Sequence, residues 1–346
     1  MKKRNVTAII LTVALTSVTL LGGCGSDKGL PGSSVEAADA TSAELKKITI
    51  GYVDSGASFP DDALAIAIDQ GYIEEEFKAI GYEAELIPFT GAGPAINEAL
   101  VNGSIDAATT GDVPAINGKS KGIDITLLAG EILYNDAALV VPADSDITSV
   151  SDLKGKTVAT LQGSYMHKTL INMLEDTGLS FADINFSSMP SADAAAAVEA
   201  KAVDAALVAN TQEAALAKSE NVRIVKNCEN NPEWKGGHAI VIRSEYLKEN
   251  RAAAVALLKV YKRAYNYSIA NYDSAITSLA KSGATAEAYR FFFPSEVNFN
   301  LSAGADAVEA YNDIKQFLLD NELLANDFDI SAWIDASVWE EAVIDE

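Results

Sequence analysis

The chain has 346 residues, of which 49% are hydrophobic and 8% aromatic, so it can bury a large core and is long enough for about two domains. Its 49 acidic residues outnumber its 26 basic residues and give a formal net charge of −23. A surface of this charge repels nucleic acid and anionic membrane surfaces, which argues against both as direct partners.

Residues 1–23 have the pattern of an export signal. Basic residues at positions 2–4 precede an apolar run over residues 6–21, which is too short and too early for a permanent membrane span. The run ends in Leu-Gly-Gly-Cys24, which resembles the bacterial lipobox, where the cysteine receives diacylglycerol and becomes the first residue after cleavage. This resemblance implies a lipid anchor on Cys24, with the protein attached to the cell membrane on its extracytoplasmic side. Residues 24–45, rich in Gly, Ser, Ala and acid, are predicted to be a flexible tether.

Strand-to-helix junctions are predicted to follow one another early in the folded part of the chain. Strands are expected over residues 48–53, 83–88 and 105–108. Each runs into a polar loop and then a proline that fits a helix start, namely Pro60, Pro94 or Pro114, and the first helix is expected to begin between Ser58 and Pro60. Such junctions indicate a parallel sheet whose carboxyl edge forms one wall of a cleft.

The middle of the chain is predicted to form a second lobe. Apolar runs over residues 137–141 and 239–242 are interpreted as strands that cross between two lobes, with Val140 and Ile240 near the hinge. Between them, strands are expected over residues 157–161, 184–186, 203–208 and 222–225, and helices from Tyr165 and over residues 191–201. From Ser244 onward the sequence is mostly helical in pattern.

Residues 149–179 carry the most detailed local signals. Ser149 with an acid three residues later predicts a capped turn, and residues 157–161 predict a buried strand. Gly163 and Ser164 then lie between the carboxyl end of that strand and the amino end of the helix that begins at Tyr165. Free backbone N–H groups and the positive end of the helix dipole meet there, which favours an anion or a polar ligand.

The same stretch resembles a known family. Its DLKGK segment, followed by Gly-Ser and Gly-Leu pairs, resembles a signature of the solute-binding proteins of ABC importers for sulfonates, nitrate, taurine and thiamine-pyrimidine precursors. The segment GYIEEEF and the pair Asp193-Ala194 with Val203-Asp204-Ala205 resemble other parts of that pattern. The resemblance implies an α/β fold of the type II periplasmic-binding-protein class, with two lobes, each a mainly parallel sheet flanked by helices, and two crossover strands at the hinge.

The resemblance also implies domain limits and site residues. Residues 46–141 and 238–346 would form lobe 1, and residues 142–237 would form lobe 2. The implied ligand-binding residues lie on strand-end loops and are Asp54, Ser55, Gly56, Gly91, Ala92, Gly93, Thr110, Gly111, Asp112, Gly163, Ser164, Tyr165, Asn210 and Thr211. Relatives that carry sulfonates often have Trp-Asp-Pro where this chain has Ala-Asn-Thr at residues 209–211, so the contacts from lobe 2 are less well defined.

The function implied is that of an extracytoplasmic solute-binding lipoprotein of an ABC importer. As a monomer, it would capture a small anion, such as a sulfonate, taurine or nitrate, between its lobes and deliver it to a permease and its ATPase. Asp54 and Asp112 leave an alternative open: they either cap helices or face the cleft. In the cleft they would favour a pyrimidine, a thiamine precursor or another nitrogen-containing solute. Tyr165 either covers the apolar body of the ligand or is simply exposed.

The cysteines and histidines give no support to an enzyme. Apart from Cys24 the only cysteine is Cys228, so no internal disulfide is available after lipidation, and Cys228 is expected to be an inert packing thiol. The two histidines, His167 and His238, belong to no metal or triad motif. We therefore expect no cofactor, no metal and no catalysis, although some relatives of this fold make thiamine-pyrimidine with a histidine in the cleft.

Overall fold

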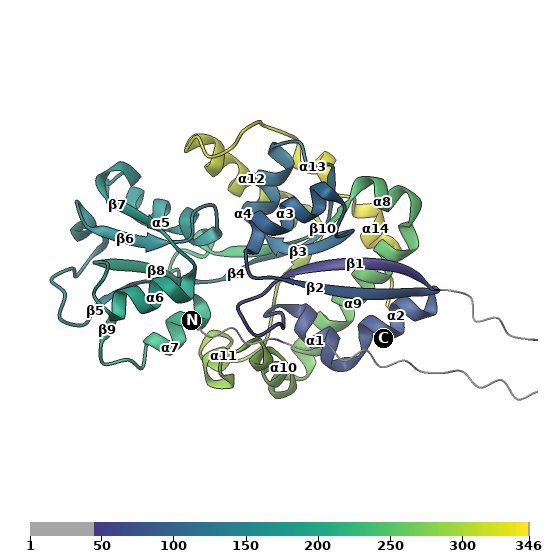
Figure 1. Cartoon of the computed structure of the whole chain (residues 1–346), viewed down its shortest axis with the longest axis horizontal. Coiled ribbons are helices and arrows are strands. Elements are labelled where there is room, and N and C mark those ends of the chain that lie inside the picture. Colours follow the sequence, from purple (N-terminus) through teal and green to yellow (C-terminus); the bar gives the residue numbers. More distant parts are fainter. Residues whose placement is uncertain (1–44, 345–346) are drawn as a thin grey trace, which may run out of the picture. The chain divides into compact units, whose positions relative to one another are not determined.

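In the computed structural model, which describes residues 45–344, two mixed β-sheets are each flanked by helices (Figure 1). We call the six-stranded sheet with its helices lobe 1 and the five-stranded sheet with its helices lobe 2. The export signal, Cys24 and all but the last residue of the predicted tether lie outside the described residues. Within residues 45–344, no helix is long and apolar enough to cross a membrane.

The sheet of lobe 1 has the strand order β11-β4-β10-β3-β1-β2. Its strands are β1 (Lys46–Val53), β2 (Tyr82–Phe89), β3 (Ala107–Gly111), β4 (Ile125–Asn135), β10 (Gly236–Arg243) and β11 (Leu301–Ser302). β1 is parallel to β2 and β3, whereas β10 is antiparallel to β3 and β4. The carboxyl ends of β1, β2 and β3 therefore share one edge of the sheet, as the strand-to-helix junctions predicted.

Helices cover both faces of this sheet. They are α1 (Ala63–Gln70), α2 (Tyr72–Ala79), α3 (Ala92–Asn102), α4 (Asp112–Ser120), α8 (Ser244–Glu249), α9 (Arg251–Ala270), α10 (Tyr272–Leu279), η4 (Ala280–Ser282), α11 (Ala286–Phe292), α12 (Ala305–Asp320), α13 (Ile330–Trp333) and α14 (Ala336–Glu341). On one face Ile48 and Ile50 of β1 pack with Leu64 of α1 and Tyr261 of α9. The other face packs against α3, α4 and α12, where Tyr311 is buried. The alternation of side chains along the strands supplies both cores.

The sheet of lobe 2 has the order β7-β6-β8-β5-β9. Its strands are β5 (Ala137–Pro142), β6 (Thr157–Thr160), β7 (Asn185–Ser188), β8 (Ala205–Ala209) and β9 (Val222–Lys226), and its helices are η1 (Val150–Leu153), α5 (Tyr165–Asp176), η2 (Phe181–Asp183), α6 (Ser191–Glu199), α7 (Asn210–Leu216) and η3 (Pro232–Trp234). β6 is parallel to β7 and β8, and β5 is antiparallel to β8 and β9. Helix α5 packs on one face of this sheet and α6 on the other.

The chain passes from lobe 1 to lobe 2 between β4 and β5 and returns to lobe 1 in β10 (Figure 1). The first passage is at Asp136, and η3 precedes the second. We call residues 135–136 and 235–237 the crossing segments. The apolar runs over residues 137–141 and 239–242, predicted to cross between the lobes, each lie within a single sheet. Val140 pairs with Ala206 inside the sheet of lobe 2, and Ile240 pairs with Thr109 inside the sheet of lobe 1. Both strands have register irregularities at these residues, between Leu139 and Val140 in β5 and between Ile240 and Val241 in β10, but each strand stays within one sheet.

Some of the predicted helix caps and helix starts are confirmed, and others are wrong. The capping box of Ser149, the Ser164 cap of α5 and the left-handed Gly178 after that helix are present. Helix α1 begins later than predicted, at Ala63, because the side chain of Asp62 accepts a hydrogen bond from the Leu64 N–H and so caps the helix there. Several residues predicted on loops lie in strands or in first helical turns, since α3 begins at Ala92 and α7 at Asn210, while β3 extends to Gly111.

Candidate functional site

Predicted site residues from three different junctions meet at the crossing segments. The Asp112 Oδ2 accepts a hydrogen bond from the Gly237 N–H at 2.7 Å. The Tyr165 hydroxyl donates to the Asp136 carbonyl at 3.0 Å, and the Asn210 amide donates to the Asn135 side chain at 3.2 Å. The starts of α4, α5 and α7 therefore converge where the chain changes lobe.

Asp112 is almost completely buried at the first turn of α4, with 2% of its surface exposed. Its Oδ1 accepts from the Val113 N–H at 2.6 Å while Oδ2 accepts from Gly237. Burial raises the pKa of Asp112, and the nearby Lys168 acts in the opposite direction. Both carboxylate oxygens thus accept hydrogen bonds from backbone N–H groups, but Asp112 is the first residue of α4 and does not cap it, since the N-cap position is Gly111.

Asp54 also accepts hydrogen bonds from backbone N–H groups. Its Oδ1 accepts from the N–H groups of Gly56 and Ser58, at 2.9 and 2.8 Å, so it fixes the loop between β1 and α1. Ser55 and Gly56 are exposed on that loop. Gly56 has φ of 107°, a conformation that favours glycine.

The predicted residues at the start of α3 pack against α4. A Cβ added to Gly93 would lie 2.2 Å from the Pro114 Cβ, so the close approach of the two helices accounts for this glycine by packing alone. Gly91 precedes the helix, and Ala92 has a positive φ of 49°. Thr110 is fully buried, and its hydroxyl has no hydrogen-bond partner among the described residues.

The start of α5 lines a cavity of about 600 Å³ that also touches lobe 1. Gly163 and Ser164 form part of the wall on the side of lobe 2, and the early turns of α3 and α4 contribute Pro94, Val113 and Pro114 on the side of lobe 1. Neighbouring Tyr165 packs against the crossing segment, because a Cβ on Gly236 would lie 2.3 Å from its ring. Thr211, in the first turn of α7, instead donates to the side chain of the adjacent Gln212 at 3.2 Å.

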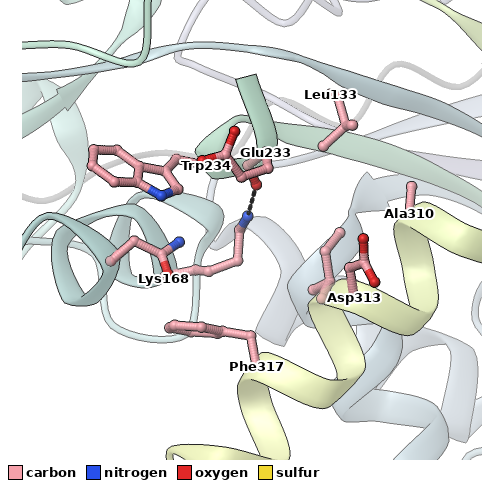
Figure 2. A pocket seen from close by; sticks show the side chains of 9 residues that line it. Leu133, Lys168, Glu233, Trp234, Ala310, Asp313 and Phe317 are labelled. Carbon is pink, nitrogen blue, oxygen red and sulfur yellow. Dashed lines mark hydrogen bonds between the residues drawn. The ribbon is translucent and has the colours of Figure 1, made fainter. Parts of the chain in front are cut away.

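Lys168 is the residue that sequence reasoning missed. It is 3% exposed, and its ammonium donates to the carbonyls of Glu233 and Lys235 at 3.1 and 3.2 Å. Figure 2 shows it extending from α5 toward Glu233, with Asp313 and Phe317 of α12 nearby. It lines both the cavity of about 600 Å³ and a second one of about 290 Å³. A signal was present, because Lys168 lies one turn after Ser164 within the apolar pattern of α5.

Burial lowers the pKa of Lys168, while the carboxylate of Asp112 acts to raise it. Among residues 45–344, Lys168 is the only buried lysine or arginine. Its hydrogen bonds go to neutral carbonyl groups, and its positive charge has no direct anionic partner within the described residues 45–344. The crevice between α5, η3 and α12 therefore has the chemistry to attract an anion.

The two histidines lie in contrasting places. His238 follows Gly237 on β10, and its Nδ1 is 2.7 Å from the Tyr134 hydroxyl and 3.2 Å from the Glu131 Oε2. Burial acts to lower the pKa of His238, but the hydrogen bond to Glu131 and the nearby acids raise it to about 9. His167 packs against Phe181 and Phe186, and burial lowers its pKa to about 4.

Cys228 is buried and free, and burial raises its pKa to about 12. A thiol with this pKa stays protonated at neutral pH and is a poor nucleophile. These properties agree with the predicted packing role.

Comparison with known proteins gives a family and a fold. The profile of the family described as NMT1/THI5 like matches residues 63–275. Proteins named "Putative aliphatic sulfonates-binding protein" are 32% identical over 191 residues in Escherichia coli (strain K12) and 28% identical over 268 residues in Bacillus subtilis (strain 168). The matches cover 55% and 77% of this chain, but 59% of the E. coli protein and 75% of the B. subtilis protein.

Solved structures resemble the whole folded part. The periplasmic aliphatic sulphonate binding protein SsuA from E. coli aligns with a TM-score of 0.70 and 24% identity, over 85% of this chain and 99% of that one. The desulfurization enzyme DSZB aligns with a TM-score of 0.68 and 17% identity, over 86% of this chain and 98% of that one. At these identities the matches establish the fold and confirm the predicted two-lobed α/β periplasmic-binding-protein architecture.

Proposed function

The chain belongs to the NMT1/THI5-like family, and from this premise we propose that it is an extracytoplasmic solute-binding protein of an ABC importer. It captures a small organic anion of the sulfonate class between its lobes and delivers it to a permease driven by an ATPase. It acts as a monomer held at the outer face of the membrane by a lipid on Cys24. The names of the two bacterial relatives support the sulfonate class.

The observation that carries this proposal is the buried ammonium of Lys168 in the crevice between α5 and α12. A sulfonate head group accepts charge-assisted hydrogen bonds from an ammonium and from the N–H groups at a helix start. Lys168 and the Gly163-Ser164 start of α5 border the same cavity of about 600 Å³. This local arrangement attracts an anion although the protein as a whole is strongly negative.

The shape of the crevice also fits a solute-binding protein. The walls of the cavity of about 600 Å³ come from the start of α5 on one side and from α3, α4 and the end of α12 on the other. A cavity of about 600 Å³ is within the usual range of small-molecule sites, roughly 300 to 1,000 Å³. Because both lobes contribute, a bound solute favours the arrangement in which the lobes lie close together.

A thermal-shift and calorimetry panel tests the proposal. The ligands are taurine, alkyl and aryl sulfonates, nitrate, hydroxymethylpyrimidine analogues and short amino acids. We expect sulfonates to raise the melting temperature and Lys168→Met to weaken their binding by at least about tenfold, because methionine keeps the length of the side chain without its charge. The matched control is Lys201→Met, since Lys201 is an exposed lysine of lobe 2 paired with Asp144. If no sulfonate binds the unmodified protein, the proposed solute class is wrong.

A nitrogen-containing solute is the second candidate, and the buried acids favour it. Asp54, Asp62, Asp112 and Glu131 all lie at or near the sheet edge that bears the strand-to-helix junctions, and each has less than a tenth of its surface exposed. Carboxylates favour an ammonium or a ring N–H donor. Binding of only cationic or heterocyclic compounds, weakened by more than about tenfold in Asp112→Asn, would replace the sulfonate proposal with this one.

We do not propose catalysis, although the fold is shared with a desulfurization enzyme. Cys228 is buried with a raised pKa, and neither histidine lies beside an activated nucleophile among the described residues. A turnover assay with each bound solute separates the two classes. Appearance of a product would overturn the assignment as a binding protein.

A further inference from the structure

A second buried cluster of charged groups lies in lobe 1, on the same face of the sheet as α1. Asp62 caps α1, while Glu131 of β4 and His238 of β10 are directly opposite each other in the ladder. The His238 Nδ1 is 3.2 Å from the Glu131 Oε2 and 3.8 Å from the Asp62 Oδ2. One ligand atom from each residue lies within 4.8 Å of the other two.

The remaining oxygen of each carboxylate accepts a hydrogen bond from a backbone N–H group of α1. The Asp62 Oδ1 accepts from the Leu64 N–H at 2.9 Å, and the Glu131 Oε1 accepts from the Ala63 N–H at 3.2 Å. The first turn of α1 therefore orients both carboxylates so that their other oxygens face His238. Hydrogen bonds of this kind hold the ligands of protein metal sites in place.

With both carboxylates ionised, the charges of the cluster do not balance. Asp62 and Glu131 have 3% and 0% of their surface exposed, and within residues 45–344 the only ion-pair partner of either is His238. One imidazolium neutralises at most one of the two carboxylates. A divalent cation would neutralise both, and buried carboxylates are stable when they are paired or coordinate a metal.

The geometry fits a transition metal bound by one nitrogen and two oxygens. A tetrahedral ion with bonds of about 2.1 Å holds its ligand atoms about 3.4 Å apart, close to the separations of 3.2 and 3.8 Å found around the His238 Nδ1. The Tyr134 hydroxyl, 2.7 Å from the same nitrogen, is the nearest candidate for a fourth oxygen. Imidazole with carboxylates suits Zn²⁺, whereas Mg²⁺ and Ca²⁺ take oxygen ligands.

We propose that Asp62, Glu131 and His238 form a divalent transition-metal site, with Zn²⁺ as its best-matched ion. The ion ties the start of α1 to β4 and β10 beside Gly237, where the chain returns from lobe 2. The sequence held no signal of this site, because its three ligands are separated by 69 and 107 residues and only the fold brings them together. The site does not depend on the proposed sulfonate, because the metal alone tests it, but it uses Asp62 and Glu131, two of the acids that favour a nitrogen-containing solute.

The test is titration of the purified, chelator-treated protein with ZnCl₂ by calorimetry, together with its melting temperature. We expect one Zn²⁺ per chain, a higher melting temperature and no response to MgCl₂. His238→Gln should weaken Zn²⁺ binding by at least about 100-fold. The matched control is His167→Gln, which removes the only other histidine of the chain and should leave the affinity unchanged.

Asp62→Asn keeps the test decisive if His238→Gln does not fold. Asparagine caps a helix as well as aspartate does, so α1 is preserved while one ligand charge is lost, and we expect at least about tenfold weaker Zn²⁺ binding. Absence of binding by the unmodified protein at Zn²⁺ concentrations up to about 1 mM would overturn the proposal. Equal binding by the unmodified protein and Asp62→Asn would also overturn it.

Discussion

The two histidines show that the same side chain has a very different pKa in the two lobes. In lobe 2, His167 lies against the rings of Phe181 and Phe186, and burial lowers its pKa to about 4. In lobe 1, burial also opposes the charge of His238, but Glu131 and Asp62 outweigh it and raise the pKa to about 9. Burial alone therefore does not set the charge of a group; the neighbours that share its site do.

The largest effect on stability should come from removing the imidazole of His238 in lobe 1. His238→Leu leaves Asp62 and Glu131 buried without their partner, and breaking such a buried pair costs about 3 to 5 kcal/mol. His167→Leu replaces a neutral ring among apolar neighbours and should cost less than about 1.5 kcal/mol. Urea unfolding of metal-free protein at pH 7 measures both. Equal losses would show that the two environments do not differ in the way described.

The second effect is a loss of stability in acid that originates in lobe 2. His167 has a pKa of about 4 in the folded protein and an ordinary value of 6.5, so the unfolded chain takes up a proton first. Its contribution is complete above pH 6.5 and is lost as the pH falls through 4, by on the order of 2 to 3 kcal/mol. Unfolding free energies of the unmodified protein and His167→Leu between pH 7 and 4 should converge. Parallel curves would contradict the assignment.

The third effect on stability is also in lobe 2 and is of similar or smaller size, but it has the opposite pH dependence. Burial raises the pKa of Glu213 from 4.5 to about 7, so the folded protein keeps a proton that the unfolded chain has lost. Its contribution to stability is present below pH 4.5 and is lost as the pH rises through 7, by on the order of 2 kcal/mol. Glu213→Gln keeps the acceptor for the Asn227 amide and should lose less stability between pH 5 and 8. An unchanged pH dependence would rule out this role.

The smallest effect on stability is expected at Lys168. Lys168→Met removes hydrogen bonds to the carbonyls of Glu233 and Lys235, but it also removes the cost of burying a charge. These opposing terms should leave a net change in unfolding free energy of no more than about 1 kcal/mol. A loss as large as that of His238→Leu would show that Lys168 serves the fold and is not kept for a solute.

The sequence was most informative where the signals were local. The capping box at Ser149, the cap at Ser164 and the left-handed Gly178 each depend on residues within four positions of one another. The alternation of short apolar strands and helical patterns likewise predicted the parallel pairing of β1 with β2 and β3. The mainly parallel sheets that the family resemblance implied are mixed instead, because β10 in lobe 1 and β5 in lobe 2 are antiparallel to their neighbours. The segments that resemble a family signature added the architecture of the two lobes.

The site depends on contacts between residues that are far apart in the sequence, and the sequence predicted these contacts less well. The position of the crossing at Asp136 follows from which strands pair, and the two-residue strand β11 exists only because it pairs with β4. The burial of Lys168 depends on carbonyl partners at Glu233 and Lys235, which are far from it in the sequence. Gly93 was interpreted as a loop glycine for a ligand, but it lies inside α3, where its missing side chain makes room for Pro114.

The crossing at Asp136 has a consequence for the order in which the protein can fold as it is made. Every strand of the sheet of lobe 2 lies within residues 137–226, so that sheet can form before the rest of the chain is synthesised. The sheet of lobe 1 must wait for β10, which is inserted between β3 and β4 and comes from about 100 residues later in the chain. Lobe 1 begins first in the sequence, but its sheet is therefore completed last. Until β10 is synthesised, β3 and β4 lack the strand that lies between them.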